Sequence, residues 1–155
     1  MGLFDRLRGG WVYEDDAVIA IMDINPLAEG HCLVIPKTRW TRVDQIPADV
    51  AAALGRSVRK VAKAVVTATG VSDYNVLQNN GKPAHQEVPH VHFHIIPKPS
   101  ASKGLGVNWP AEKLADDDAK AMQAKAKAAA KSAKDKLTGR GKKKPFFGDD
   151  DDDDD

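Results

Sequence analysis

The stretch VPHVHFHIIP, residues 88–97, places histidines on every second position, at His90, His92 and His94. Successive side chains of a β-strand point to opposite faces, so this alternation predicts a strand with one imidazole face. A strand rises roughly 3.3 Å per residue, which would space the histidine backbones by about 6.7 Å. The opposite face would be apolar, formed by Pro89, Val91, Phe93, Ile95 and Pro97.

A helix that could cover this apolar face is predicted from Pro47 to Gly70. Proline is favoured in the first turn of a helix, and glycine is favoured just after the last turn. Between them, apolar residues recur every three or four positions, which predicts a single apolar stripe. The stripe consists of Val50, Leu54, Val58, Val61 and Val65.

Four further segments have the composition of strands. Residues 11–15 and 17–23 are β-branched and aromatic runs around an acidic turn, which predicts a hairpin. Residues 31–36 are apolar almost throughout, so this strand should lie mid-sheet with both faces covered, and residues 74–78 form another strand. The order of elements lacks strand–helix alternation, so we predict an α+β fold: an antiparallel sheet of about five strands with one long helix.

The chain is predicted to contain one domain and an extension. Residues 1–110 would be the domain, with 12 basic and 10 acidic side chains. Residues 111–137 are rich in Ala and Lys, which predicts a peripheral helix with little to bury. Residues 138–155 pass from basic to seven consecutive aspartates and should be disordered. This distribution does not favour a dedicated nucleic-acid binder, which would spread positive charge over a folded face.

Composition also constrains the compartment. No apolar run approaches the roughly 20 residues of a membrane span, and the N-terminal residues show no secretory signal. Cys32 is the only cysteine, so no internal disulfide can form. We therefore expect a protein without membrane association, located in the cytoplasm, with the nucleus as an alternative.

Three explanations of the histidine row were weighed. It could be the polar face of a half-buried strand, although such positions usually carry Thr, Lys, Glu or Arg. Two of the histidines could bind one zinc ion, but the backbone of the third would lie about 13 Å from the first, and no acidic residue or cysteine is spaced locally to complete the site. Covalent catalysis is the third: imidazole, with a pKa near 6.5, is a good nucleophile at neutral pH.

The residues that favour the third explanation resemble a known family. HVHFHII, residues 90–96, is similar to the pattern His-φ-His-φ-His-φ-φ of the histidine triad (HIT) superfamily of nucleotide hydrolases and transferases, where φ is apolar. Residues 12–37 resemble the N-terminal half of that family's domain, and residues 75–99 resemble its C-terminal half, most closely in the fungal Hint-type branch. GLGVNWP, residues 104–110, is similar to the closing stretch of that branch.

The resemblance implies catalytic roles for four histidines. His92 would attack the α-phosphorus and hold a nucleotidyl-imidazole intermediate, which water would then cleave. His90 and His94 would flank it, polarising the phosphate and assisting the leaving group. His31, eight positions after an acidic residue at a strand end, would support the triad from the neighbouring strand.

The resemblance also implies substrate contacts. Asp23 would hold the ribose hydroxyls, and Ile21 and Ile24 would line the base. Asn79 and the backbone of Glu87 and Val88 would contact the phosphate. Trp109 matches a tryptophan that reaches the partner's site in Hint-type dimers, so a homodimer is expected.

Two departures from the family pattern refine the expected activity. The zinc-binding cysteine pair with which many members begin is missing from residues 1–10, so we expect neither a structural zinc nor a cofactor. Glu87 replaces a serine of some animal relatives, and a carboxylate there would disfavour anionic leaving groups.

The predicted function is therefore cleavage of the P–N bond in adenosine 5'-phosphoramidates, releasing AMP, with aminoacyl-adenylates as related substrates. The alternatives are a dinucleotide polyphosphate hydrolase of the same superfamily, or a nucleotide-binding scaffold acting through the charged tail.

Overall fold

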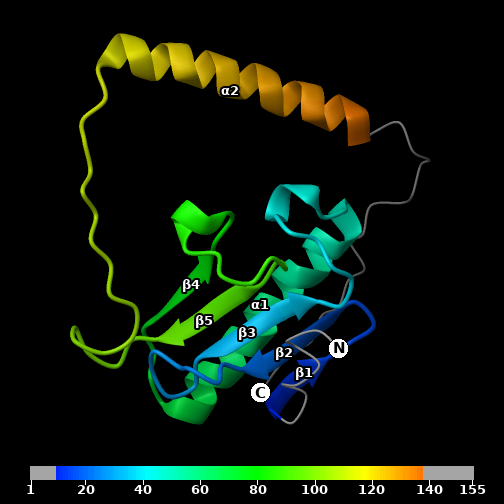
Figure 1. Ribbon diagram of the computed structural model, residues 1–155, viewed down its shortest axis with the longest axis vertical. Helices are drawn as coiled ribbons and strands as arrows, with labels where there is room; N and C mark the ends of the chain where they lie inside the picture. Colours follow the sequence, from blue (N-terminus) through cyan, green and yellow to red (C-terminus); the bar gives the residue numbers. More distant parts are fainter. Residues whose placement is uncertain (1–9, 138–155) are drawn as a thin grey trace, which may run out of the picture. The chain divides into compact units, whose positions relative to one another are not determined.

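The computed structural model describes residues 10–137, which form a five-stranded antiparallel sheet and two long helices (Figure 1). The strands lie in the order β1-β2-β3-β5-β4. This arrangement confirms the predicted α+β fold. The strands are β1 (Trp11–Glu14), β2 (Val18–Met22), β3 (Cys32–Pro36), β4 (Tyr74–Gln78) and β5 (Phe93–Pro97).

Strand β3 occupies the middle of the sheet, as its apolar sequence predicts. All five of its residues are buried, and it pairs antiparallel with β2 on one side and β5 on the other. At the end of the β2–β3 ladder the Asp23 N–H donates to the carbonyl of His31 at 2.9 Å. The hairpin therefore places an acidic side chain beside a histidine, although eight positions separate them in the sequence.

Helix α1 (Ala48–Thr69) covers one face of the sheet, as predicted. It begins after Pro47 and ends at Gly70, whose φ of 70° is the left-handed conformation that glycine adopts without strain. Leu54, Val61 and Val65 of α1 pack with Ile95 of the sheet and with Val91, which lies just before β5. The other face carries a smaller cluster, formed by Ile21, Leu33 and Ile35.

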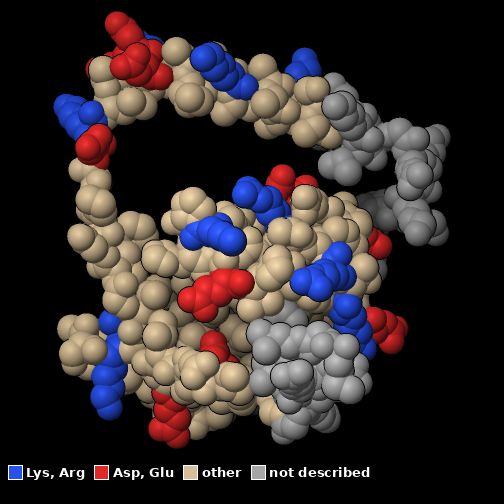
Figure 2. Space-filling model, in the orientation of Figure 1, with Lys and Arg blue, Asp and Glu red and all other residues tan. Residues whose placement is uncertain are grey.

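The chain divides after Asn108 into two compact units. In the second unit the described regular structure is helix α2 (Asp116–Leu137), which begins five residues later than residue 111. Three aspartates stand in its first turn, where acidic groups interact favourably with the helix dipole. Figure 2 shows acidic groups gathered at that end and lysines farther along.

Of α2, every residue whose burial is described is exposed, as expected for a helix of Ala and Lys. Among residues 10–137, no helix is both long and apolar enough to cross a membrane. The prediction of disorder for residues 138–155 lies outside the described residues.

Candidate functional site

The histidine segment forms a shorter strand than its alternation predicts. Strand β5 begins at Phe93, so His90 and His92 lie in the segment that leads into it. Pro89 cannot donate a ladder hydrogen bond, and the Val91 N–H donates to the carbonyl of Trp40, which lies outside the sheet. The prediction of a row of three histidines along one strand was therefore wrong for the first two. The rings of His92 and His94 are nevertheless close, with centroids 4.9 Å apart.

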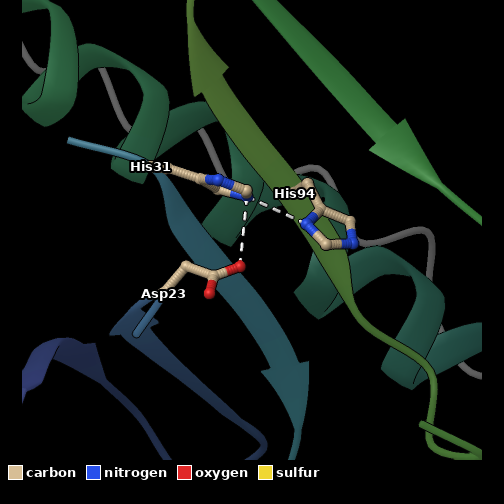
Figure 3. A group of neighbouring side chains, drawn as sticks. All are labelled: Asp23, His31 and His94. Carbon is tan, nitrogen blue, oxygen red and sulfur yellow. Dashed lines mark hydrogen bonds and ion pairs between the residues drawn. The ribbon is translucent and has the colours of Figure 1, made fainter. Parts of the chain in front are cut away.

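His94 belongs to a cluster that three elements build on the sheet (Figure 3). It lies in β5, while His31 immediately precedes β3 and Asp23 immediately follows β2. Nε2 of His31 lies 2.9 Å from Nδ1 of His94 and 3.4 Å from Oδ2 of Asp23. His31 itself is buried, with 2% of its surface exposed.

Hydrogen bonds determine which nitrogen of each ring in this cluster carries the proton. The Leu27 N–H donates to Nδ1 of His31 at 3.0 Å, so the proton of neutral His31 must be on Nε2. That N–H then donates to Nδ1 of His94. It follows that neutral His94 carries its own proton on Nε2, where it can donate to a ligand.

The same reasoning applies to His92 and His90. Nδ1 of His92 lies 2.7 Å from the carbonyl oxygen of His90, and a carbonyl only accepts, so Nδ1 carries the proton. Nε2 of His92 therefore has the lone pair that a nucleophile needs. Nε2 of His90 donates to the carbonyl of Pro36 at 2.8 Å.

The surroundings hold several of these histidines neutral. Burial, together with nearby His92 and His31, lowers the pKa of His94 from 6.5 to about 4, although Asp23 opposes the shift. Burial also lowers the pKa of His31, again against Asp23. Burial is likewise the main cause that lowers the pKa of His90, assisted by Arg39 and His92 and opposed by the hydrogen bond to Pro36. The hydrogen-bonded tautomers of His94, His31 and His90 therefore persist at neutral pH.

These shifts predict how stability depends on pH. A histidine whose pKa is lowered by folding takes up a proton more readily in the unfolded state, so acid favours unfolding. The free energy of unfolding should be unaffected by His94 above pH 6.5 and should fall as the pH drops from 6.5 towards 4. Denaturant unfolding across this range should show a weaker pH dependence in His94→Asn than in the wild type. Identical slopes in the two proteins would contradict the assignment.

Asp23, His31 and His94 also have the spacing of a metal site, since each offers one ligand atom within 4.8 Å of the others. Near the histidine row in the sequence, no acidic residue has the spacing of a metal ligand. The fold nevertheless brings Asp23 to His31 and His94. However, a metal ion would need a lone pair on Nε2 of His31. That nitrogen carries the proton, because Nδ1 of the same ring accepts from the Leu27 N–H. The observed hydrogen bonds therefore favour a relay of hydrogen bonds from Leu27 through His31 to His94 over metal ligation.

The predicted base-binding residues have different environments. Ile24 follows Asp23 and is 65% exposed, so it is open to a ligand. Ile21 is only 1% exposed and packs with Leu33 and Ile35, so its side chain supports the surface rather than forming it. Oδ1 of Asp23 accepts from the Asn25 N–H at 2.8 Å, which fixes the turn that presents Ile24.

The predicted phosphate-binding residues lie in the segment between β4 and β5. Asn79 follows β4, and its side chain lies 3.5 Å from the carbonyl oxygen of His85. Glu87 is exposed, and the carbonyl of Val88 accepts from the His90 N–H at 2.8 Å. Trp109 is 82% exposed and belongs to the second compact unit.

Sequence reasoning missed one buried polar residue in this region. Gln86 is 7% exposed and bonds to both Thr41 and Gly81. Its partner Thr41 is 45 positions away, and no periodicity or motif relates the two. Only the folded backbone reveals the contact.

Comparisons with known proteins found chains of similar sequence. The family model described as "HIT domain" matches residues 8–101. The adenosine 5'-monophosphoramidase of Schizosaccharomyces pombe is 46% identical over 104 residues, which are 67% of this chain and 75% of that protein. The adenosine 5'-monophosphoramidase of Saccharomyces cerevisiae is 48% identical over 93 residues, 60% of this chain but only 56% of that protein.

The fold is also similar to that of a crystal structure. The histidine triad nucleotide-binding protein from Candida albicans has a TM-score of 0.72 and 38% sequence identity. The alignment covers 79% of this chain and 89% of that chain. The likeness therefore extends over most of both molecules.

Proposed function

The chain belongs to the HIT domain family, and on this basis we propose that it hydrolyses the P–N bond of adenosine 5'-phosphoramidates and releases AMP. The observation that carries the proposal is the tautomer of His92, whose Nδ1–H donates to the His90 carbonyl and leaves the lone pair on Nε2. The two yeast relatives named as adenosine 5'-monophosphoramidases support the same activity. The chain spans only about half of one of them, so the full activity remains a proposal.

In the first step, Nε2 of His92 attacks the α-phosphorus and the P–N bond to the leaving amine breaks. The product is AMP linked through phosphorus to the imidazole. The departing amine takes its proton from a water molecule, and the Nε2–H of neutral His94 can donate a hydrogen bond to the oxygen of that water. His31 keeps that proton in place, because its own Nε2–H occupies Nδ1 of His94.

In the second step, water attacks the same phosphorus, the bond from phosphorus to His92 breaks, and AMP leaves. The attacking water is the molecule that protonated the amine, so it attacks as hydroxide, with the Nε2–H of His94 as its hydrogen-bond donor. His90, whose Nε2–H is bonded to the Pro36 carbonyl, would act through its own carbonyl, which accepts from Nδ1 of His92 and orients the nucleophile. Asp23 would hold the ribose, with Ile24 and the buried Ile21 forming and supporting the base surface.

The leaving group should be set by Glu87. This side chain is exposed in the loop before the triad, where its negative charge would repel an anionic leaving group and tolerate an amine. We predict that kcat/KM is higher for an adenosine phosphoramidate than for a diadenosine polyphosphate. Replacing Glu87 with serine should lower the ratio of the two kcat/KM values by about two- to fivefold, which is the effect expected from removing one exposed charge.

The measurement is a substrate panel of phosphoramidates, aminoacyl-adenylates and dinucleotide polyphosphates. Glu112→Ser, which removes an exposed carboxylate of the second unit, is the matched control and should leave the ratio unchanged. Equal or better turnover of the diadenosine polyphosphate by the wild type would reverse the assignment in favour of a dinucleotide polyphosphate hydrolase.

We also propose that the protein is a homodimer. Strand β4 lies at an edge of the sheet and leaves Tyr74 and Val76 partly exposed, at 43% and 48%. Exposed apolar side chains on an edge strand are typical of a surface that pairs with another chain. Sedimentation velocity should give twice the chain mass, and a monomer at micromolar concentration would contradict the proposal.

A further inference from the structure

Gln86 connects two segments that flank the histidines. Its Nε2 donates to the carbonyl of Thr41 at 2.6 Å, and its Oε1 accepts from the Gly81 N–H at 2.7 Å. Its own backbone N–H donates to the carbonyl of Gly81 at 3.1 Å. Both backbone polar groups of Gly81 are thus bonded to a single residue that is almost completely buried.

The Gln86 bond belongs to a larger set that joins the last residue of β3 and the segment after it to the segment before β5. The set contains five hydrogen bonds, and the one from Gln86 reaches Thr41, in the segment after β3. The pairs are Pro36 O with His90 Nε2 at 2.8 Å, Arg39 Nε with Pro89 O at 3.4 Å, Trp40 O with Val91 N at 2.8 Å, Thr41 O with Gln86 Nε2 at 2.6 Å, and Val43 N with Asn80 Oδ1 at 2.9 Å.

The chemistry of this position requires an amide. One end of the side chain must donate to a carbonyl and the other must accept from an N–H, which neither a carboxylate nor a thioether of similar length can do. The strength of the requirement follows from the burial of Gln86 itself, which is 7% exposed, because a buried polar side chain without partners costs about 1–3 kcal/mol. Gly81 has a φ of 93°, and a Cβ there would lie 2.9 Å from the Arg42 guanidinium, so a side chain at this position would strain the loop that Gln86 holds.

We infer that Gln86 is a positioning residue for phosphate recognition: it fixes the backbone of Glu87 and Val88, which directly follow it. The inference rests on the proposed function, in which those two peptide groups contact the α-phosphate. Phosphoryl transfer depends on dipoles that are fixed where charge develops, so a loosened backbone weakens transition-state stabilisation. The adenosine part of the substrate, held by Asp23 and Ile24, would not be affected.

The test is Gln86→Met, which keeps the length of the side chain and removes both hydrogen bonds. We expect kcat for an adenosine phosphoramidate to fall at least tenfold, while the affinity for adenosine stays within twofold of wild type. Binding of AMP, measured by calorimetry, should weaken at least fivefold. Gln123→Met, the same change on the exposed surface of α2, should alter none of these values.

Two outcomes would overturn the inference. One is a lower melting temperature with kcat and AMP affinity unchanged, which would indicate a structural role alone. The other is equal weakening for AMP and adenosine, which would indicate general damage to the site. If Gln86→Met does not fold, Gly81→Ala is the second variant, because it displaces the loop at the residue whose N–H donates to Gln86. Its affinity for AMP should fall while its affinity for adenosine stays within twofold of wild type. A wild type that binds AMP without turnover would refute the proposed function, yet the binding comparison would still test Gln86.

Discussion

Replacing His92 with alanine is expected to lower kcat for an adenosine phosphoramidate by at least about 10⁴-fold, the scale seen when a covalent nucleophile is removed. The reason is the lone pair on Nε2, which the bond from Nδ1–H to the His90 carbonyl fixes on the outer nitrogen. Alanine provides no atom to form the intermediate. A nonhydrolysable AMP analogue should still bind, because the ribose and base contacts involve other residues. Steady-state kinetics and calorimetry on the same preparation measure both quantities.

The matched control is His85→Asn, which removes another histidine of the same segment. His85 is exposed and has a φ of 66°, a conformation that asparagine tolerates better than most residues. Its kcat should stay within about threefold of wild type. If His92→Ala retained comparable activity, the chain would not use His92 as its nucleophile.

Replacing His31 with phenylalanine should lower kcat by about 10²-fold, the upper range for losing a residue that orients a reacting histidine. Phenylalanine keeps the ring but cannot donate to Nδ1 of His94, so the proton of His94 is no longer confined to Nε2. The Leu27 N–H also loses its acceptor, which should cost about 0.5–1.5 kcal/mol of stability, the net contribution of a typical hydrogen bond. Kinetics and denaturant unfolding test the two effects separately. Unchanged kcat in a destabilised variant would show that His31 only packs.

Much of the fold could be predicted because its determinants are local. The stripe on α1 follows from residue spacing, and the central position of β3 follows from its apolar sequence. The closeness of Asp23 and His31 depends on the β2–β3 register, in which Met22 pairs with Cys32. The family resemblance implied roles for both Asp23 and His31. The spacing of residues in the sequence did not place either of them beside His94.

The parts that could not be predicted depend on contacts distant in sequence. The alternation through His90 and His92 indicates a strand, but Val91 bonds to Trp40 instead, and the strand begins only at Phe93. Nothing in the sequence singles out Gln86, because its partner Thr41 lies on a different connection. Tautomers are equally invisible in a sequence, since the carbonyls and N–H groups that select them become neighbours only after folding.

The central claim is that His92 becomes covalently bonded to the nucleotide. The most direct measurement is rapid alkaline quenching of a single turnover, followed by mass spectrometry of the peptide that contains residues 88–97. We predict an adenylyl group on His92 that disappears as AMP is released, and its absence from His92→Ala. Turnover without any adduct, or an adduct confined to another residue, would contradict the account.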